Sequence, residues 1–432
     1  MVEKIIIGKD KKDLKEFGDA GTVFIGKHIV GEGEDAHLTN PVFMDVTRPH
    51  VMLISGKRGS GKSYTSSVIA EEITALPKVI KQNISVLMID TMGIFWSMNY
   101  PNERDRDLLE KWNLKPKSVK MNFFVPEKYV EDYDKFGIPV HSIFKLKTSD
   151  MSSNDWSMTF GFSFVDPTGI AIERVVKKLK DDKGDDYSIE DIIAEIEADD
   201  RMEAKTKNIL ISRFNVAQDW GLFDRVGTPV QKLFQKGQVS VLDVSHFERT
   251  GTGWSVRGML VGLLSRRIFQ ERLTARKAEE FEVISGESSK TVPMVWLVMD
   301  EAHQFVPNEG HTVATEPILT LVKEGREPGI SLCMITQRPN KLHPDVLAQS
   351  DIVLSHRLTA KEDITALQSV MQTYMRDDIK AYINKLPKQK GTAILIDDNS
   401  ERIFPIQVRP RLSWHAGGSP SAIKKKGIFD DL

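Results

Sequence analysis

The sequence predicts an α/β protein in which a largely parallel sheet is flanked by helices. Short apolar runs alternate with helical patterns along most of the chain, as in successive β–α–β units. Two runs, ISVLMID and QVSVLDVS, carry an acid at or near their carboxyl end, and another, VMLIS, leads into a glycine-rich stretch. Crossover helices cover both faces of a parallel sheet, which explains why these runs are almost wholly apolar.

The composition narrows the class of protein. The 432 residues are 40% hydrophobic, enough for a large core, and the net charge is −2, so no global basic character marks a nucleic-acid binder. A ring that concentrates positive charge in its pore stays compatible with this balance. The single cysteine, Cys333, excludes an internal disulfide and fits a reducing compartment. Without a signal peptide or a membrane-length apolar run, we expect a cytoplasmic protein with no membrane insertion.

The glycine-rich stretch is the strongest motif in the chain. It reads GKRGSGKS and matches G-x-x-x-x-G-K-[ST] in full, between an apolar strand and a helical pattern that runs to about Leu76. This arrangement predicts the phosphate loop of a P-loop NTPase with ATP and Mg²⁺ as cofactors, rather than an ordinary glycine-rich turn. Lys62 is expected to reach the β- and γ-phosphates, and the Ser63 hydroxyl to bind Mg²⁺. The residues expected around the phosphates are Gly56, Arg58, Gly59, Ser60, Gly61, Lys62, Ser63 and Tyr64.

A second half of the ATP site is predicted where the apolar run Val295–Met299 ends in Asp300 and Glu301. At the carboxyl edge of a parallel sheet, Asp300 is expected to hold Mg²⁺, usually through water. Glu301 is expected to act as the general base that activates the attacking water. An apolar run followed by two acids is a weak signal alone, but it becomes strong downstream of a phosphate loop.

Two further polar residues are candidates near the γ-phosphate. Gln337 ends the run ISLCMITQ, which is expected to lie between the phosphate-loop strand and the acidic strand, so that its side chain sits between Lys62 and Glu301. The alternative is a turn cap at residues 337–339. Arg326 follows the helical stretch TEPILTLVKE and is either a charge at the helix end or an arginine finger for a neighbouring subunit. From the residues alone these two roles are equally open.

The sequence divides into a core with additions. The predicted units are a short N-terminal β segment (1–48), a P-loop ATPase core of RecA/FtsK-like type (49–165 and 234–412), a helical insertion (166–233) and a C-terminal tail (413–432). Within the insertion, Ser188 and Asp191 form a predicted capping box. In the core, a long helix is expected from Trp254 to Ala278, with a polar surface loop in EEFEVISGESSK after it.

These motifs together resemble the HerA/FtsK superfamily of ring-forming DNA pumps, and HerA-like ATPases in particular. The resemblance spans residues 22–418, and its most specific part is residues 321–367. The matching motifs, in order, are the phosphate loop with Lys62 and Ser63, IDTMG with Asp90, LDVS with Asp243, MDEAHQF with Asp300 and Glu301, EGR with Arg326, and TQRP with Gln337.

The resemblance implies a homohexamer that hydrolyses ATP at subunit interfaces, with Arg326 as a finger acting in trans. Arg357 is a second candidate for contact with the γ-phosphate or the interface. Asp90 and Asp243 would support the site or the pore loops, and strand-end hydrogen bonding is the open alternative. Family members carry an N-terminal barrel that docks a NurA-like nuclease. Because only about fifty residues precede the phosphate-loop strand, a complete barrel is not expected here.

The resemblance also implies that the ring grips double-stranded DNA without regard to sequence. Such rings hold phosphates through basic loops, and the candidates here follow the strands that end at Asp90 and Asp243. The candidate loops lie near Trp96, Arg249, Thr250 and Arg257, and the sequence does not select individual contacts among them. The function predicted is an ATP-driven translocase or helicase on double-stranded DNA. The alternatives are a secretion, conjugation or packaging motor, and a nucleotide-gated hexameric scaffold that recruits a nuclease or another effector enzyme.

Overall fold

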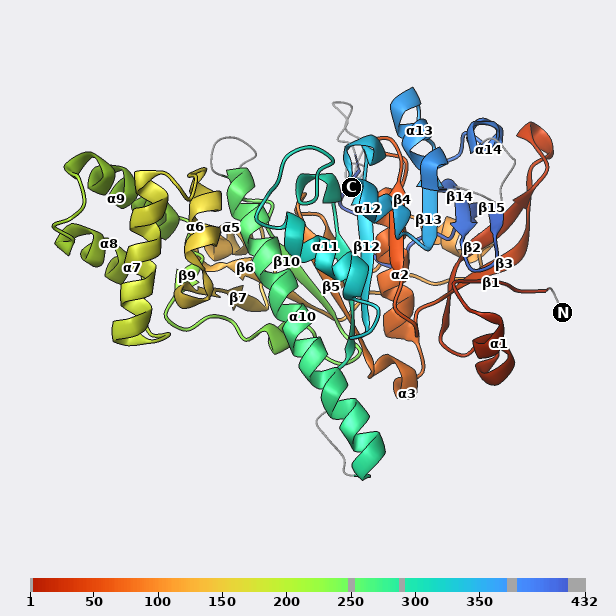
Figure 1. Ribbon diagram of the computed structural model, residues 1–432. Coiled ribbons are helices and arrows are strands. Elements are labelled where there is room, and N and C mark those ends of the chain that lie inside the picture. Colours follow the sequence, from red (N-terminus) through yellow and green to blue (C-terminus); the bar gives the residue numbers. More distant parts are fainter. Residues whose placement is uncertain (1–2, 248–252, 287–291, 371–378, 419–432) are drawn as a thin grey trace, which may run out of the picture.

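A 13-stranded sheet forms the centre of the computed structural model, which describes residues 3–247, 253–286, 292–370 and 379–418 (Figure 1). In order across the sheet the strands are β1 (Ile5–Ile7), β3 (His37–Asp45), β2 (Thr22–Val30), β15 (Arg402–Val408), β14 (Thr392–Asp397), β13 (Ile352–His356), β4 (Val51–Ser55), β12 (Ile330–Thr336), β11 (Met294–Met299), β5 (Ile84–Asp90), β10 (Val239–Asp243), β6 (Met121–Pro126) and β7 (Ser142–Phe144). A separate parallel pair joins β8 (Leu146–Lys147) to β9 (Phe223–Asp224).

The core of the sheet is parallel, as the sequence predicts. Every neighbouring pair from β13 to β7 is parallel, while β13, β14, β15, β2 and β3 pair antiparallel in turn and β1 lies parallel to β3. Strand β12 lies between β4 and β11, which confirms the extra strand expected there. The carboxyl ends of β4, β12, β11, β5 and β10 therefore meet at one edge of the sheet, where α/β proteins bind ligands.

Helices cover both faces of the sheet. They are α1 (Lys11–Phe17), α2 (Lys62–Ala75), α3 (Lys78–Lys81), α4 (Arg106–Lys111), α5 (Val130–Lys135), α6 (Ser153–Phe160), α7 (Pro167–Lys183), α8 (Ile189–Ala198), α9 (Ala204–Asp219), α10 (Gly253–Ser285), α11 (Thr315–Glu324), α12 (Pro344–Ala348), α13 (Lys361–Val370) and α14 (Ile379–Lys385). Although α10 has 33 residues, no helix in the described ranges is both long and apolar enough to cross a membrane.

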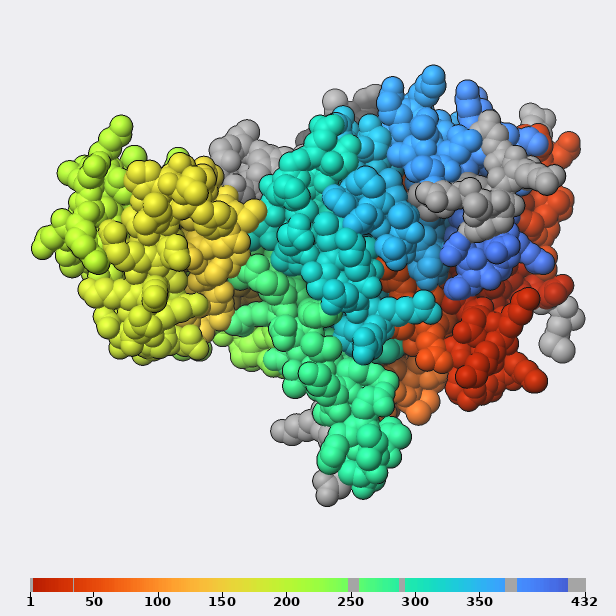
Figure 2. Space-filling view, in the orientation of Figure 1, coloured from red at the N-terminus to blue at the C-terminus, as the bar shows by residue number. Residues whose placement is uncertain are grey.

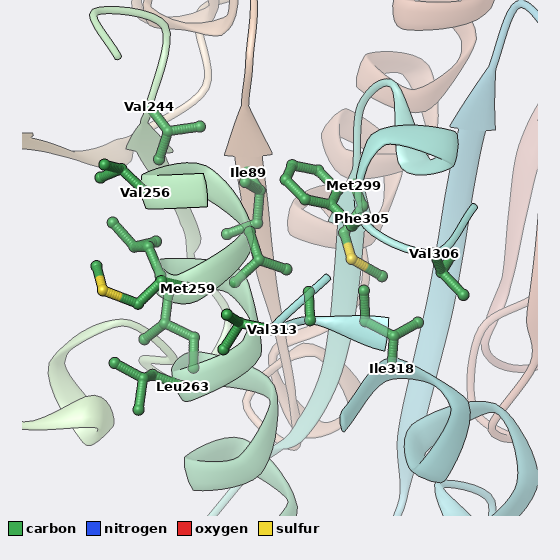
Figure 3. Close-up of a cluster of buried hydrophobic side chains, with 14 of the residues drawn as sticks. Ile89, Val244, Val256, Met259, Leu263, Met299, Phe305, Val306, Val313 and Ile318 are labelled. Carbon is green, nitrogen blue, oxygen red and sulfur yellow. The ribbon is translucent and has the colours of Figure 1, made fainter. Parts of the chain in front are cut away.

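The side chains of each buried strand alternate between two hydrophobic cores. In β5, Leu87 and Ile89 join one core, and Val86 and Met88 join the other. Figure 3 shows the first of these cores, where Ile89 and Met299 of the sheet face side chains such as Met259 of α10 and Ile318 of α11. The second core packs the sheet against α2 through Val68, Ile69 and Ile73. Burial on both faces fixes the strands that carry the site at the sheet edge.

Helix α10 is longer than the sequence prediction. The loop expected over EEFEVIS is wrong, because the helix continues to Ser285 and its end projects beyond the body of the molecule (Figure 2). This stretch is rich in glutamate, a good helix former, and Arg276 pairs with Glu280 one turn later. The buried Arg272 also pairs with Glu279 at 3.0 Å, which holds the turn beyond Ala278 in place. Residues 287–291 of the predicted loop lie outside the described ranges.

The predicted insertion is helical and lies beyond the β7 edge of the sheet (Figure 1). Helices α7, α8 and α9 fall within residues 166–233, and the capping box of Ser188 and Asp191 is confirmed at the start of α8. Helix α6 precedes residue 166 and packs against α7 and α10, with Trp156 stacked on Phe160. The insertion therefore shares apolar packing with the sheet-bearing body through α6 and α10.

A buried ion cluster joins the N-terminal strands to the core. It lies at the amino ends of β4 and β13, away from the phosphate loop at the carboxyl end of β4. His50 Nδ1 lies 2.6 Å from Asp351 Oδ2, and its Nε2 lies 3.7 Å from Asp45 Oδ2. Lys9 Nζ lies 3.9 Å from Asp45 Oδ1, and the Trp296 ring packs on the imidazole. Burial alone would lower the pKa of His50, but the two carboxylates outweigh it and raise this pKa to about 9.

We expect this cluster to make the stability of the fold depend on pH. The pKa of His50 in the folded protein lies above the unfolded value of about 6.5, so its contribution is complete below that pH and is lost as pH rises through about 9. Melting curves between pH 6 and 9.5 should show the gap between wild type and His50→Gln narrowing as pH rises. A gap that stays constant over this range would contradict a charged His50.

Candidate functional site

The phosphate loop has the backbone shape that the motif predicts. It runs from the end of β4 at Ser55 to the start of α2 at Lys62, and Gly56, Gly59 and Gly61 have φ angles of 152°, 73° and 118°. Side chains disfavour these conformations, and a Cβ on Gly56 would lie 2.5 Å from Ser60 Oγ. The loop can therefore close with its N–H groups turned inward only because glycines occupy these positions.

The two basic side chains Lys62 and Arg58 of the loop differ in burial. Lys62 is buried, and its Nζ donates to the Lys57 carbonyl at 3.1 Å, so the side chain folds back over the loop. Burial lowers the pKa of Lys62, while the charges of Glu301 and Asp300 oppose that shift. Arg58 is exposed at the tip of the loop. Lys62 is therefore held near the acids that follow β11, two strands away in the sheet, where a phosphate chain would lie.

The two predicted acids follow β11 at the same sheet edge. Ser63 Oγ lies 3.5 Å from Asp300 Oδ2, and Asp300 Oδ1 accepts the Glu301 N–H at 3.0 Å. Burial and the adjacent Glu301 raise the pKa of Asp300 to about 7, against the opposing charge of Lys62. Glu301 has a left-handed backbone with φ of 52°, a conformation that costs energy in a residue with a side chain. Such strain concentrates at functional sites, which supports the choice of Glu301.

The Ser63 hydroxyl and the Asp300 carboxylate suit a magnesium ion. Mg²⁺ takes oxygen ligands, keeps several waters and is held by one or two carboxylates together with substrate phosphates. Within the described ranges there is no cluster of three or more His, Cys, Asp or Glu that could hold a metal. Ser63 and Asp300 together offer one hydroxyl and one carboxylate, which fits an ion that also takes oxygens from water and from a nucleotide.

Gln337 lies beside Glu301, as predicted from the strand order. Its Nε2 donates to Glu301 Oε1. A residue that the sequence analysis missed, His303, contacts the other carboxylate oxygen: its Nδ1 lies 3.5 Å from Glu301 Oε2 and 3.0 Å from Thr336 Oγ1. Glu301 is thus held from both sides, by Gln337 directly after β12 and by His303 on its own loop. The four-residue stretch from Asp300 to His303 was the only sequence signal for this contact.

His356, which the sequence analysis did not single out, contacts the helix that follows the phosphate loop. It is fully buried at the end of β13, and its Nδ1–H donates to the Thr392 carbonyl at 2.9 Å. This leaves Nε2 as the acceptor, 2.9 Å from the Thr65 hydroxyl of α2. Burial lowers the pKa of His356 to about 4, so the ring is neutral at physiological pH. A lone histidine on an apolar strand has no motif that would have revealed this role.

With this geometry in place, comparison with known proteins assigns the family. Residues 23–266, more than half of the chain, match the family described as the central domain of helicase HerA. The chain belongs to the HerA family. A probable DNA double-strand break repair helicase HerA of Methanocaldococcus jannaschii is 21% identical over 352 residues, which cover 74% of this chain and 64% of that relative. The chain therefore spans a little under two thirds of that HerA protein's length.

Two solved structures share the fold of this HerA-family chain. VirB4 of Thermoanaerobacter pseudethanolicus aligns with a TM-score of 0.52 and 11% identity, over 89% of this chain and 97% of VirB4. The bacterial conjugative coupling protein TrwBdeltaN70 aligns with a TM-score of 0.51 and 12% identity, over 92% of this chain and 96% of that protein. These likenesses establish the predicted α/β P-loop ATPase fold.

The HerA-family acids Asp90 and Asp243 end two paired strands, β5 and β10. Asp90 accepts hydrogen bonds from four consecutive backbone N–H groups, those of residues 92–95, at 2.7–3.1 Å. Asp243 accepts from the Tyr133 hydroxyl and from the Ser245 N–H. Burial and the nearby Asp243 raise the pKa of Asp90. Both acids thus make the strand-end hydrogen bonds that the sequence analysis left open, and they shape the loops that follow.

Arg326 lies near the amino end of β12, whereas the phosphate loop lies at the carboxyl ends of the parallel strands. Arg326 is exposed after α11 and lines an open pocket of about 530 Å³ with Phe269 and Leu273 of α10. Arg326 lies before the first residue of β12 and Gln337 follows its last residue. The seven residues of the strand therefore separate the two by about 20 Å. Arg326 and Glu301 of one chain therefore do not meet. Arg357, in contrast, lies beside the phosphate loop, because its carbonyl accepts the Lys57 N–H at 3.0 Å.

The residues near the loops that were candidates for DNA contact have different surroundings. Arg257 is buried, and its guanidinium donates to the Val244 and Ser245 carbonyls at 2.9 and 2.8 Å. It therefore holds the loop after β10 and does not face solvent. Trp96 is half-buried against Tyr100. Arg249 and Thr250 lie outside the described ranges.

Proposed function

We propose that this chain is an ATP-hydrolysing motor that moves along double-stranded DNA. The observation that carries the proposal is the meeting of Lys62, Ser63, Asp300, Glu301 and Gln337 at adjacent strand ends in a chain of the HerA family. The named relative from Methanocaldococcus jannaschii, described as a probable DNA repair helicase, supports DNA as the partner. A nuclease or another effector enzyme is a further proposed partner.

In the proposed reaction Glu301 takes a proton from a water molecule while that water attacks the γ-phosphate of ATP. The bond between the β,γ-bridging oxygen and the γ-phosphorus breaks, and the products are ADP and phosphate. Gln337 and His303 hold the two carboxylate oxygens of Glu301, which keeps the base aimed at the water. Lys62 stabilises negative charge on the phosphates. Magnesium, when bound at Ser63 and Asp300, would supply further positive charge for the phosphate oxygens.

We also propose a homohexameric ring in which Arg326 of one subunit completes the site of its neighbour. The support is geometric: Arg326 lies about 20 Å across the sheet from its own Gln337, which is beyond the reach of an arginine side chain. The residue is exposed and follows α11 at a surface free for contact with a second copy. A site that needs an arginine from another subunit would couple hydrolysis to ring assembly.

The function is tested by measuring ATP hydrolysis with and without linear double-stranded DNA, at low and moderate salt, on protein sized by light scattering. We expect stimulation that falls steeply with salt and does not depend on DNA sequence, because phosphate contacts release counterions. The Lys62→Ala variant is the control and should show no hydrolysis with or without DNA. A ring that hydrolyses ATP but does not respond to DNA would contradict translocation and favour the alternatives, a secretion, conjugation or packaging motor or a scaffold that recruits an effector enzyme.

A further inference from the structure

A segment near the C-terminus lies across the start of the phosphate-loop helix. Residues 409–416, here called the strap, follow β15 and pack on α2. Glu71 of α2 anchors the strap by accepting hydrogen bonds from the Arg409 guanidinium at 2.9 Å, from the Leu412 and Ser413 N–H groups at 3.1 and 2.9 Å, and from the Ser413 hydroxyl at 2.6 Å. Glu71 and Arg409 are buried, so the strap is fixed to the same helix that carries Lys62 and Ser63.

The strap meets the phosphate loop at Tyr64, the residue directly after Ser63. The Tyr64 hydroxyl accepts the Arg411 N–H at 2.6 Å, and the Arg411 guanidinium lies 5.7 Å from the centre of the tyrosine ring. The His415 ring packs edge-on against Tyr64 with the ring centres 5.4 Å apart. Tyr64 thus turns its hydroxyl toward the strap, although the sequence analysis placed it among the phosphate-binding residues.

The hydrogen bonds of His415 define which of its nitrogens carries the proton. Arg411 Nη1 lies 3.0 Å from His415 Nδ1, and a guanidinium can only donate, so Nδ1 accepts and Nε2 bears the hydrogen. Burial, together with the charges of Arg411 and Arg104, lowers the pKa of His415 to about 4, which keeps the ring neutral. His415 is only partly buried, so it carries an N–H donor on a rigid ring next to Tyr64.

The position of this donor relative to the catalytic acids indicates what it meets. Asp300 and Glu301 mark the end of the loop where the γ-phosphate would lie, and the α-phosphate of a bound nucleotide lies near the residues that follow the loop lysine. The nucleoside is attached to the α-phosphate and extends away from Glu301. Tyr64 is the second residue after Lys62, so we expect Tyr64 and the His415 ring that packs on it to lie at that end. The Gly391 N–H donates to the Ser60 carbonyl of the loop at 3.4 Å.

We propose that the strap forms the nucleoside subsite of the ATP site, in which the His415 Nε2–H donates to an acceptor atom of the nucleoside and the Tyr64 ring packs beside it. This inference rests on the proposed ATPase function. Arg411 is a positioning residue, because it fixes the His415 tautomer and holds Tyr64 through its backbone. The strap thereby makes nucleotide affinity depend on a segment some 350 residues from the phosphate loop in sequence, as the separation of 347 between Tyr64 and Arg411 shows.

The test separates the nucleoside from the phosphates by comparing ADP with magnesium tripolyphosphate, which carries no nucleoside. His415→Phe keeps an aromatic ring against Tyr64 but removes the donor, and His415→Gln restores an N–H donor. We expect His415→Phe to bind ADP about tenfold more weakly, which corresponds to the loss of roughly one hydrogen bond. Inhibition of its ATP hydrolysis by tripolyphosphate should be unchanged, and its kcat should stay within about threefold of the wild-type value. His415→Gln should recover most of the ADP affinity, and His37→Ala, at an exposed site on β3, should match wild type.

The other outcomes overturn the proposal in distinguishable ways. Equal weakening of ADP and tripolyphosphate would mean that His415 only supports the phosphate loop. Unchanged ADP affinity in His415→Phe, with a melting temperature like that of wild type, would remove His415 from the site. If the wild type neither binds nor hydrolyses ATP, the proposed ATPase function itself fails.

Discussion

Glu301→Gln is expected to lower the rate of ATP hydrolysis by about 10²- to 10⁴-fold while ATP still binds, the range typical of losing a general base. Glutamine has nearly the same shape, and its Oε1 can still accept the hydrogen bond from Gln337, so the site keeps its geometry. What the amide cannot do is take a proton from the attacking water. Single-turnover hydrolysis and retention of bound ATP on the same samples measure the two steps separately.

A matched control for this substitution is Glu362→Gln, which makes the same chemical change at an exposed position on α13 and should hydrolyse ATP at the wild-type rate. Wild-type hydrolysis by Glu301→Gln would assign the base to another residue. Loss of ATP binding in the variant would instead mean that Glu301 shapes the phosphate site and does not act only on the water.

The residues of the candidate site that sequence predicted are those with a local signature. The phosphate loop needs a strand, glycines and a helix within a dozen residues, and the chain meets each need between Val51 and Ser63. Asp300, Glu301 and Gln337 follow apolar strands, and parallel strands bring their carboxyl ends to one edge. This rule was enough to place Gln337 beside Glu301 across the 36 residues that separate them.

Residues that support the site through contacts distant in sequence have no local motif that would predict them. His356 reaches Thr65 across 291 residues, and the strap reaches Tyr64 across 347. Each contact depends on which strands become neighbours. Strands β14 and β15 pair antiparallel, so no crossover helix in the sequence indicates which strands they join. An isolated histidine in an apolar run is also compatible with ordinary packing, so no residue pattern could choose between the two roles.

Secondary structure was hardest to predict where polar residues dominate. The stretch after Ala278 has few apolar residues to show a helical period, and its polar composition predicts a loop. Its helix is held instead by charge pairs along α10, of which Arg272 with Glu279 is partly buried. The N-terminal strands were predicted as strands, but their position beyond β15 follows from pairing with a segment near the other end of the chain.

Arg326→Ala is expected to reduce ATP hydrolysis by about 10³-fold or more, the scale of an arginine finger, although the residue lies far from the phosphate loop of its own chain. A side chain at the far edge of the sheet can act on the reaction only from a neighbouring subunit. Arg326→Lys should recover little activity, because an ammonium lacks the planar fork that binds two phosphate oxygens. Nucleotide binding by Arg326→Ala should stay close to wild type, since its Lys62, Ser63 and Asp300 are intact.

Mixing two inactive variants decides whether Arg326 acts in trans. Rings assembled from Arg326→Ala and Lys62→Ala contain sites in which the first supplies the phosphate loop and the second supplies the arginine, and we expect hydrolysis to reappear at these sites. Arg402→Ala, at an exposed position on β15, serves as the arginine control and should be active alone. Light scattering and labelled subunits must show that the two variants share rings, because only then does the result bear on the interface. Shared rings that stay inactive would return Arg326 to the role of a surface charge at the end of α11.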